Sequence, residues 1–268
     1  WPGLEAVVVN SDQTACLRFG AVAQEHGARC VSFGRSSAAH YRLHSTVYTL
    51  SGLSTELINV QGQPVRLLAP VVGDFNAENL ALVYACLSEL GFDDERVKHA
   101  LGCVTAAPGR MQQVSSQPCV IVDYAHTPDA LEKLIKALRP VAEQRGGRLH
   151  ILFGCGGDRD PGKRPVMGRV AESLADQVWI TSDNPRSEHP QAIIQDILGG
   201  IVTPGASTLH VVEDRALAIR ECVTKASLQD VVLLAGKGHE TTQLVGDQVL
   251  KHSDVECALT ALKECGLV

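Results

Sequence analysis

The hydrophobic and polar positions of residues 1–111 predict a βαβ unit followed by an antiparallel meander and two helices. Continuous apolar runs mark the first two strands, whereas alternating apolar and polar residues mark the later three. Helical periodicity fills the remaining stretches, and Asp93 is a suitable N-cap for the last helix. The expected strands are residues 6–10, 29–33, 46–50, 55–60 and 65–69, and the expected helices are residues 12–26, 76–90 and 93–101.

After a Pro/Gly break at residues 106–110, strands and helices alternate regularly, and we expect a domain boundary near residue 112. This alternation is typical of a mainly parallel α/β sheet with helices on both faces. A late hairpin is expected around Gly246 and Asp247. The expected strands are residues 119–123, 148–153, 177–181, 208–212 and 230–235, and the expected helices are residues 128–143, 164–175, 189–200, 214–227 and 253–265.

Composition narrows the class of protein. Of the 268 residues, 45% are hydrophobic and 20% are charged, which is typical of a globular protein with a sizeable core. A net charge of -6 and an aromatic content of 4% argue against a nucleic-acid surface. No apolar run approaches the ~18 residues of a membrane-spanning helix. The nine cysteines form no Cys-x-x-Cys pair, which indicates reduced packing residues of a cytosolic protein.

Unusual polar residues follow four of the predicted strands in the second part of the chain. These loops are residues 123–128, 154–159, 183–186 and 236–240. Because parallel strands end at one edge of a sheet, we expect all four loops to lie along the edge where open α/β sheets bind ligands. Solubility alone does not require acids, bases and glycines to gather there, so the sequence predicts a binding site.

The stretch Thr-Ser-Asp-Asn-Pro-Arg at 181–186 is the centre of this hypothesis. Pro185 turns the chain after an apolar strand, which presents Asp183, Asn184 and Arg186 at the carboxyl end of that strand. An acid, an amide and a guanidinium suit the charged end of a small amino acid. A turn with an Asx cap and a solvated arginine is the alternative interpretation.

The other three loops also allow two interpretations each. Asp123 and His126 suit a ribose or a metal-bound phosphate, or only a capped helix start. The glycines of 154–157 let backbone N–H groups approach an anion, or form a tight turn. Lys237 suits a phosphate or carboxylate and Glu240 an ammonium, or the two form a solvated salt bridge.

Two nucleotide-binding patterns are approached but not met. Residues 157–164, Gly-Asp-Arg-Asp-Pro-Gly-Lys-Arg, almost fit the P-loop pattern G-x-x-x-x-G-K-S/T. Arg164 offers no hydroxyl for Mg²⁺, and two acids inside the loop would repel phosphate. Residues 154–157 lack the third glycine of the dinucleotide fingerprint.

Together, the loop motifs resemble those of the Mur ligases. The motifs are Tyr-Ala-His-Thr-Pro-Asp-Ala-Leu at 124–131, Gly-Cys-Gly-Gly-Asp-Arg-Asp at 154–160, Asp-Asn-Pro-Arg at 183–186 and Gly-Lys-Gly-His-Glu at 236–240. Residues 73–79 and 109–111 are similar to the end of the family's central domain. The resemblance implies that residues 1–111 are the C-terminal part of a central ATP-binding domain. It also implies that residues 112–268 are a Rossmann-like C-terminal domain that binds an amino acid.

The resemblance implies an ATP-dependent amide ligase of bacterial peptidoglycan precursor synthesis, located in the cytoplasm. Such a ligase joins UDP-N-acetylmuramoyl-L-alanyl-D-glutamate to a diamino acid with ATP and Mg²⁺, through an acyl phosphate that the incoming amine attacks. Arg186 resembles the form that adds meso-diaminopimelate, because lysine lacks a distal carboxylate to pair with it. A monomer is expected, with no nucleic-acid partner and no membrane insertion.

The resemblance assigns two sets of binding residues and no catalytic or metal-binding residue. The set expected to bind ATP is Asn76 near the adenine, Arg110, Asp123 at the ribose, and His126. The set expected to bind meso-diaminopimelate is Arg159, Asn184 and Arg186 for the far carboxylate, Gly236 and Glu240 for the far ammonium, and Asp183 to orient the motif.

The family's P-loop, carbamoylated lysine and UDP-binding domain have no counterpart in these 268 residues, and we expect them upstream of Trp1. The chain alone is therefore expected not to turn over ATP. Residues 106–108, Ala-Ala-Pro, depart from the family pattern. Four alternatives stay open: a lysine-adding sister ligase, a folylpolyglutamate synthase-like ligase, a nucleotide-cofactor oxidoreductase, and a non-catalytic module that binds an amino acid.

Overall fold

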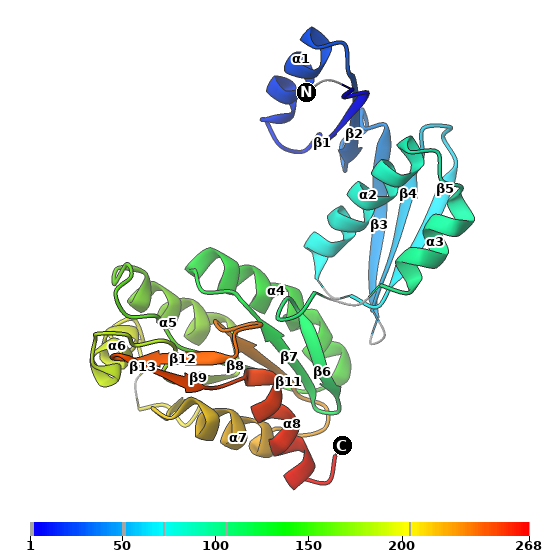
Figure 1. Cartoon of the computed structure of the whole chain (residues 1–268). Coiled ribbons are helices and arrows are strands. Elements are labelled where there is room, and N and C mark those ends of the chain that lie inside the picture. The colour runs from blue at the N-terminus through cyan, green and yellow to red at the C-terminus, as the bar shows by residue number, and fades with distance from the viewer. Residues whose placement is uncertain (1–2, 50–51, 72, 105–106, 204, 268) are drawn as a thin grey trace. The chain divides into compact units, whose positions relative to one another are not determined.

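The computed structural model (Figure 1) describes residues 3–49, 52–71, 73–104, 107–203 and 205–267. The chain divides into two compact units, residues 1–105 and residues 106–268. This division precedes the domain boundary expected near residue 112, so residues 107–111 belong to the second unit. Residue 50 of an expected strand and Ala106 of the expected break lie outside the described residues.

The first unit contains a five-stranded sheet in which sheet order equals chain order. Its strands are β1 (Ala6–Asn10), β2 (Arg29–Gly34), β3 (Tyr41–Thr49), β4 (Gly52–Ile58) and β5 (Pro64–Ala69). The first three strands are parallel, and β4 and β5 complete an antiparallel meander. The helices are α1 (Cys16–Glu25), α2 (Asp74–Glu89) and α3 (Asp94–Gly102). The predicted βαβ unit, meander and helices are confirmed.

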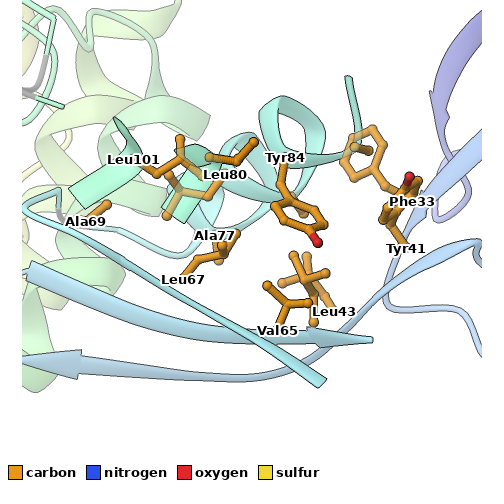
Figure 2. Packing of buried hydrophobic residues seen from close by; sticks show 14 of the residues in the cluster. Phe33, Tyr41, Leu43, Val65, Leu67, Ala69, Ala77, Leu80, Tyr84 and Leu101 are labelled. Carbon is orange, nitrogen blue, oxygen red and sulfur yellow. The ribbon is translucent and has the colours of Figure 1, made fainter. Parts of the chain in front are cut away.

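A hydrophobic core joins this sheet to helices α2 and α3 (Figure 2). Buried and exposed residues alternate along β5, since Leu67 is fully buried while its neighbour Leu68 is 55% exposed. Tyr84 of α2 meets Tyr41 of β3 edge to face, with 5.8 Å between ring centroids. The period of two in the sequence therefore decides which face of the meander meets the helices.

Two elements of the first unit differ from the sequence prediction. Helix α1 begins at Cys16 instead of Asp12, because the Asp12 carboxylate accepts the backbone N–H groups of Arg35 at 2.7 Å and Ser36 at 3.0 Å. Asp12 therefore stabilises the turn after β2 rather than the start of the helix. Strand β3 begins earlier than expected, because its first residues pair with β2.

The second unit contains a six-stranded sheet. In sheet order the strands are β10 (Leu209–Val211), β9 (Gln177–Ile180), β8 (Leu149–Phe153), β11 (Val231–Ala235), β7 (Cys119–Asp123) and β6 (Gln112–Ser116). All pairs are parallel except β6 with β7. The five parallel strands are confirmed. Edge strand β6 is not predicted, because Gln-Gln-Val-Ser-Ser carries a single apolar side chain.

Helices cover both faces of this sheet (Figure 1). Helices α4 (Pro128–Arg145) and α5 (Lys163–Leu174) pack together on one face, and α6 (Pro190–Leu198) packs against α5. Helices α7 (Arg215–Lys225) and α8 (Asp254–Glu264) pack together on the other face. Every residue of β7, β8 and β11 is buried, as continuous apolar runs predict. The expected late hairpin is β12 (Thr242–Val245) and β13 (Gln248–Lys251).

Leu67→Ala is expected to lower the free energy of unfolding of the first unit by about 2–5 kcal/mol, because it leaves a cavity in the core. Leu68→Ala on the same strand is the matched control, and its effect should stay within about 0.5 kcal/mol. Urea unfolding followed by circular dichroism measures both variants. Equal losses would contradict the burial pattern of β5.

Candidate functional site

A cavity of about 380 Å³ opens at the carboxyl edge of the second sheet. Strands β9, β8, β11 and β7 are neighbours and run parallel, so the loops that follow them meet at this edge, as predicted. The cavity is lined by Tyr124, His126, Thr127, Gly154, Gly156, Arg159, Asp160, Lys163, Asp183, Asn184, Arg186, Gly236 and Glu240. It therefore gathers the complete set of residues expected to bind the amino acid, together with His126.

The loop after β9 is held by hydrogen bonds within itself and from β12. The Asp183 carboxylate accepts the N–H of Asn184 at 2.7 Å, and the Asn184 side-chain oxygen accepts the N–H of Leu244 at 3.0 Å. The side chain of Gln243 donates to the Asp183 carbonyl at 2.7 Å. Asp183 and Asn184 are buried, so this loop is more than a solvated turn.

Arg186 has a backbone φ of 52°, a conformation that residues with a side chain rarely adopt. Pairing with the β12–β13 hairpin holds it there, because its N–H donates to Leu244 at 3.0 Å and its carbonyl accepts from Gly246 at 2.7 Å. Guanidinium Nη1 donates to the Gly157 carbonyl at 2.8 Å. Within the described part of the chain, Nε and Nη2 make no hydrogen bond. Strain of this kind is found at functional sites, and here it places a partly unpaired guanidinium at the cavity.

Lys237, Asn184 and Glu240 form a closed triangle of hydrogen bonds. Lys237 is fully buried, and its ammonium donates to Asn184 Oδ1 at 3.0 Å and to Glu240 Oε2 at 2.9 Å. Asn184 Nδ2 donates to the same Glu240 oxygen at 2.9 Å. The salt bridge that the sequence allows between Lys237 and Glu240 is present, but its ammonium is buried rather than solvated.

Glu240 provides the negative charge of the cavity wall beside Arg186. Burial alone would raise the pKa of this carboxyl, but hydrogen bonds from Lys237 and Asn184 and the charge of Arg186 hold the pKa below its usual value. Glu240 is therefore ionised at neutral pH. A guanidinium suited to a carboxylate and a carboxylate suited to an ammonium thus line one cavity, and the pair fits a zwitterionic amino-acid head.

Two glycines of the site are required by close approach. A Cβ at Gly157 would overlap the backbone carbonyl of Pro185, and a Cβ at Gly154 would overlap the backbone carbonyl of Thr181. The Gly157 N–H donates to the Asn184 carbonyl at 2.9 Å. The Gly-rich loop after β8 therefore packs against the 183–186 loop, as the tight-turn interpretation expects.

Cys155 in this Gly-rich loop is a packing residue. It is buried, and its Sγ lies 3.7 Å from Met167 Sδ. Burial raises the pKa of its thiol to about 12, so the thiol stays protonated and unreactive at neutral pH.

Asp123, at the end of β7, holds the backbone just before β6 and just after β7. Its carboxylate is buried and accepts the N–H groups of Met111 and Ala125, each at 2.7 Å. Burial raises the pKa of this carboxyl, although the backbone donors and Arg110 act in the opposite direction. Each oxygen keeps a lone pair, so a further donor such as a ribose hydroxyl can still be accommodated.

Arg110, Tyr124 and His126 form a contiguous surface beside Asp123. The Arg110 guanidinium lies over the Tyr124 ring, 4.7 Å from its centroid. The His126 ring meets Tyr124 edge to face at 4.9 Å, and its Nδ1 lies 2.8 Å from the Tyr124 carbonyl. Thr127 caps helix α4 through the N–H of Ala130, so the loop is a capped helix start as well as a cavity wall.

The two remaining predicted site residues are peripheral or separate. Arg159 is exposed, and one of its guanidinium nitrogens donates to the Asp158 carbonyl at 3.0 Å. Asn76 lies in the first turn of α2 in the first unit, where its side chain accepts from Asn79 at 3.1 Å. The structure therefore brings the amino-acid set together in one unit and leaves Asn76 in the other.

A buried ion pair beneath the site is not predicted from the sequence. Arg215 binds Asp254 through Nε at 2.8 Å and Nη2 at 2.6 Å, and both residues are inaccessible to solvent. Arg215 also donates to the carbonyls of Ser182 at 3.4 Å and Ala235 at 2.9 Å. These carbonyls immediately precede Asp183 and Gly236, so one side chain ties together the starts of two site loops. An arginine at the start of an ordinary helix gives no sequence signal for this role.

A second arginine missed by sequence reasoning supports the Gly-rich loop. Arg164 is buried and binds Glu188 through two nitrogens at 2.8 Å and Asp196 at 2.8 Å. It also donates to the Gly156 carbonyl at 3.3 Å. Arg164 takes the hydroxyl position of the P-loop pattern, and its partners show that this loop is braced by protein side chains.

Three further observations limit the chemistry of the described residues. They include no group of three or more His, Cys, Asp or Glu side chains arranged to hold a metal ion. The nine cysteines, which all lie in the described ranges, are free thiols. No helix in the same ranges is long and apolar enough to cross a membrane.

Comparison with protein families identifies both units. The model of the Mur ligase middle domain matches residues 3–87, and that of the Mur ligase glutamate ligase domain matches residues 109–238. The chain belongs to the Mur ligase family. The chain is 43% identical to a UDP-N-acetylmuramoyl-L-alanyl-D-glutamate--2,6-diaminopimelate ligase from Acidovorax sp. (strain JS42) over 99% of its length, and 45% identical to the Coxiella burnetii ligase of the same name over 97%. It covers 53% of each relative, and thus spans about half their length.

Solved structures agree with this Mur ligase assignment. The structure of a UDP-N-acetylmuramoyl-L-alanyl-D-glutamate--2,6-diaminopimelate ligase matches 98% of the chain and 54% of its own, with a TM-score of 0.73 and 34% identity. A folylpolyglutamate synthase from Mycobacterium tuberculosis matches 98% of the chain and 56% of its own, with a TM-score of 0.68 and 18% identity. The second likeness shows a shared fold only.

Asp254→Ala in this Mur ligase chain is expected to lower the free energy of unfolding of the second unit by about 3–5 kcal/mol, because it leaves Arg215 buried and unpaired. The double variant Arg215→Met with Asp254→Leu is expected to recover most of that loss. Denaturant unfolding measures both. A double variant that is less stable than Asp254→Ala would contradict the prediction.

Low pH should weaken the ion pair of Arg215 and Asp254. The Arg215 charge and the hydrogen bonds from Arg215 and His252 outweigh burial and hold the pKa of Asp254 well below its usual range. The stability that Asp254 contributes is thus present above its unfolded pKa of about 4 and is lost as the pH falls towards its folded pKa. Unfolding measured from pH 6 to pH 3 should lose more free energy in the wild type than in the double variant. An equal acid loss would contradict this assignment.

Proposed function

We propose that this chain is the nucleotide- and amino-acid-binding part of an ATP-dependent ligase that adds meso-diaminopimelate to UDP-N-acetylmuramoyl-L-alanyl-D-glutamate. One observation carries the proposal: a strained, partly unpaired Arg186 and an ionised Glu240 line the same cavity. Relatives named for this activity match 97–99% of the chain, which supports the choice of reaction.

The two ends of meso-diaminopimelate are equivalent in kind, since each carries a carboxylate and an ammonium. In the proposed complex, Arg186 and the exposed Arg159 bind the far carboxylate, and the free oxygen of Glu240 binds the far ammonium. Asp183 and Asn184 keep this wall in place through the bonds to β12. The near amino group then extends out of the pocket towards the acyl group.

The proposed chemistry proceeds in two steps. The γ-phosphoryl group of ATP is transferred to the D-glutamyl carboxylate, which gives an acyl phosphate and ADP. The near amine of meso-diaminopimelate, once deprotonated, attacks the acyl carbon, and phosphate leaves as the amide forms. This chain contributes mainly by holding the amine in position, which replaces a bimolecular encounter by a local one.

On the second unit, the nucleotide is proposed to contact the surface of Arg110, Asp123 and His126. Contact of Asn76 in the first unit with the adenine stays a separate prediction. The stacked Arg110 suits a phosphate, and the remaining lone pairs of Asp123 suit a ribose hydroxyl. The described residues offer no cluster of ligands for Mg²⁺. We propose that Mg²⁺ enters with the phosphates of ATP, as is usual for this ion.

Arg186→Ala is expected to weaken binding of meso-diaminopimelate to the chain by roughly a hundredfold, because a bidentate, partly buried partner of the far carboxylate is removed. L-Lysine, which lacks that carboxylate, is expected to bind the wild type at least a hundredfold more weakly than meso-diaminopimelate. Isothermal titration calorimetry with both amino acids measures these differences. Arg220→Ala, an exposed arginine of α7 paired with Glu264, is the matched control.

Two results would contradict the proposal. Equal affinity for the two amino acids would favour the lysine-adding sister ligase. Unchanged affinity in Arg186→Ala would remove this residue from the pocket.

A further inference from the structure

Lys237 is the least expected residue of the candidate site. It is a lysine with no solvent exposure, on the loop directly after β11, and it does not itself line the cavity. A buried ammonium is costly unless it is paired and hydrogen-bonded. Lys237 satisfies this requirement with the two side chains, Asn184 and Glu240, that carry the polar wall of the cavity.

The hydrogen bonds of this cluster leave few acceptors free. Asn184 Oδ1 accepts from Lys237 at 3.0 Å and from the Leu244 N–H at 3.0 Å, so both of its lone pairs are used. Glu240 Oε2 accepts from Lys237 and from Asn184 Nδ2, each at 2.9 Å. Among the described residues, nothing donates to Glu240 Oε1. A ligand ammonium that approaches Glu240 therefore meets one oxygen of that carboxylate.

The charges of the cluster have a consequence for selectivity. The positive charge of Lys237 balances the negative charge of Glu240 at 2.9 Å, so the pair is close to neutral when seen from the cavity. The remaining charged side chains of the lining, Arg159, Lys163 and Arg186 against Asp160 and Asp183, leave the site with a net positive charge. A ligand with an ammonium but no carboxylate is repelled by this wall, whereas a zwitterionic head offers a partner to each side.

We propose that Lys237 is a positioning and specificity residue that fixes Asn184 and Glu240 and makes the pocket select a zwitterionic head over a lone ammonium. This inference rests on the proposed function, because it assumes that the cavity holds the far end of a diamino acid. It adds a residue to that function, and it assigns the rejection of lysine jointly to Arg186 and to the neutralised Lys237–Glu240 pair.

Lys237→Met, which keeps the length of the side chain without its charge, tests the proposal in the present chain. Calorimetry should show meso-diaminopimelate binding weakened by about tenfold or more. The affinity ratio of meso-diaminopimelate to L-lysine should fall by about tenfold, because an unbalanced Glu240 attracts the lone ammonium of lysine. Lys251→Met is the matched control, since Lys251 pairs with Glu256 in an exposed ion pair, and it should change neither quantity.

A double-mutant cycle with Glu240→Gln separates positioning from general destabilisation. If Lys237 acts through Glu240, the double variant should bind meso-diaminopimelate within about twofold of the weaker single variant. Losses that multiply, or an unchanged amino-acid ratio in Lys237→Met, would overturn the inference. Failure of the wild type to bind meso-diaminopimelate would instead overturn the proposed function, and this inference with it.

A measurement on the wild type covers the case in which Lys237→Met does not fold. Nitrogen-detected NMR of the lysine ammonium groups should show the Lys237 ammonium protected from exchange, both alone and with meso-diaminopimelate bound. Loss of that protection on binding would mean that the ligand displaces Lys237, which would overturn the inference.

Discussion

The carboxyl ends of parallel strands share one edge of a sheet, and the second unit depends on this constraint. Strands β9, β8, β11 and β7 are adjacent in space although four helices, α4 to α7, separate them in sequence. Each strand is almost wholly apolar, so its polar residues can lie only where it ends. The acids, bases and glycines of the loops that follow therefore lie around one cavity.

A second layer of interactions turns these loops into a site with defined geometry. Arg215, buried against Asp254, binds the carbonyls before two of the loops. Arg164 braces the Gly-rich loop, and Lys237 joins Asn184 to Glu240. Each of these buried cations is paired with an acid. Each therefore orients the neighbouring loop groups and adds no exposed charge. The site consequently presents Arg159, Arg186 and the carboxylates of Asp183 and Glu240, whereas the three buried cations face inward.

The sequence predicts much of the fold because strong local signals agree with tertiary packing. The alternation around Leu67 and the apolar runs of the second unit give most of the strands, and the predicted N-cap Asp93 begins the helix that follows it. That the loops with Asp183, Asn184, Arg186, Gly236 and Glu240 meet follows from their position after parallel strands, whereas the resemblance to the Mur ligases assigns these residues their roles.

Contacts between distant segments account for what the sequence does not predict. Asp12 lies outside α1 because its carboxylate accepts backbone N–H groups from the turn after β2. Strand β6 forms because it pairs with the free edge of β7. A lysine at position 237 gives the same sequence signal whether its side chain is solvated or buried. Its burial depends on the contact with Asn184, which lies far away in sequence. Arg215 and Arg164 are hidden from sequence reasoning for the same reason.

The central claim is that the second unit selects a diamino acid with a distal carboxylate for amide formation. The most direct test is ATP-dependent phosphate release by the complete gene product that contains these 268 residues, supplied with UDP-N-acetylmuramoyl-L-alanyl-D-glutamate and either meso-diaminopimelate or L-lysine. The account predicts release with meso-diaminopimelate alone, abolished by Arg186→Ala. Release with lysine, or with neither amino acid, would contradict it.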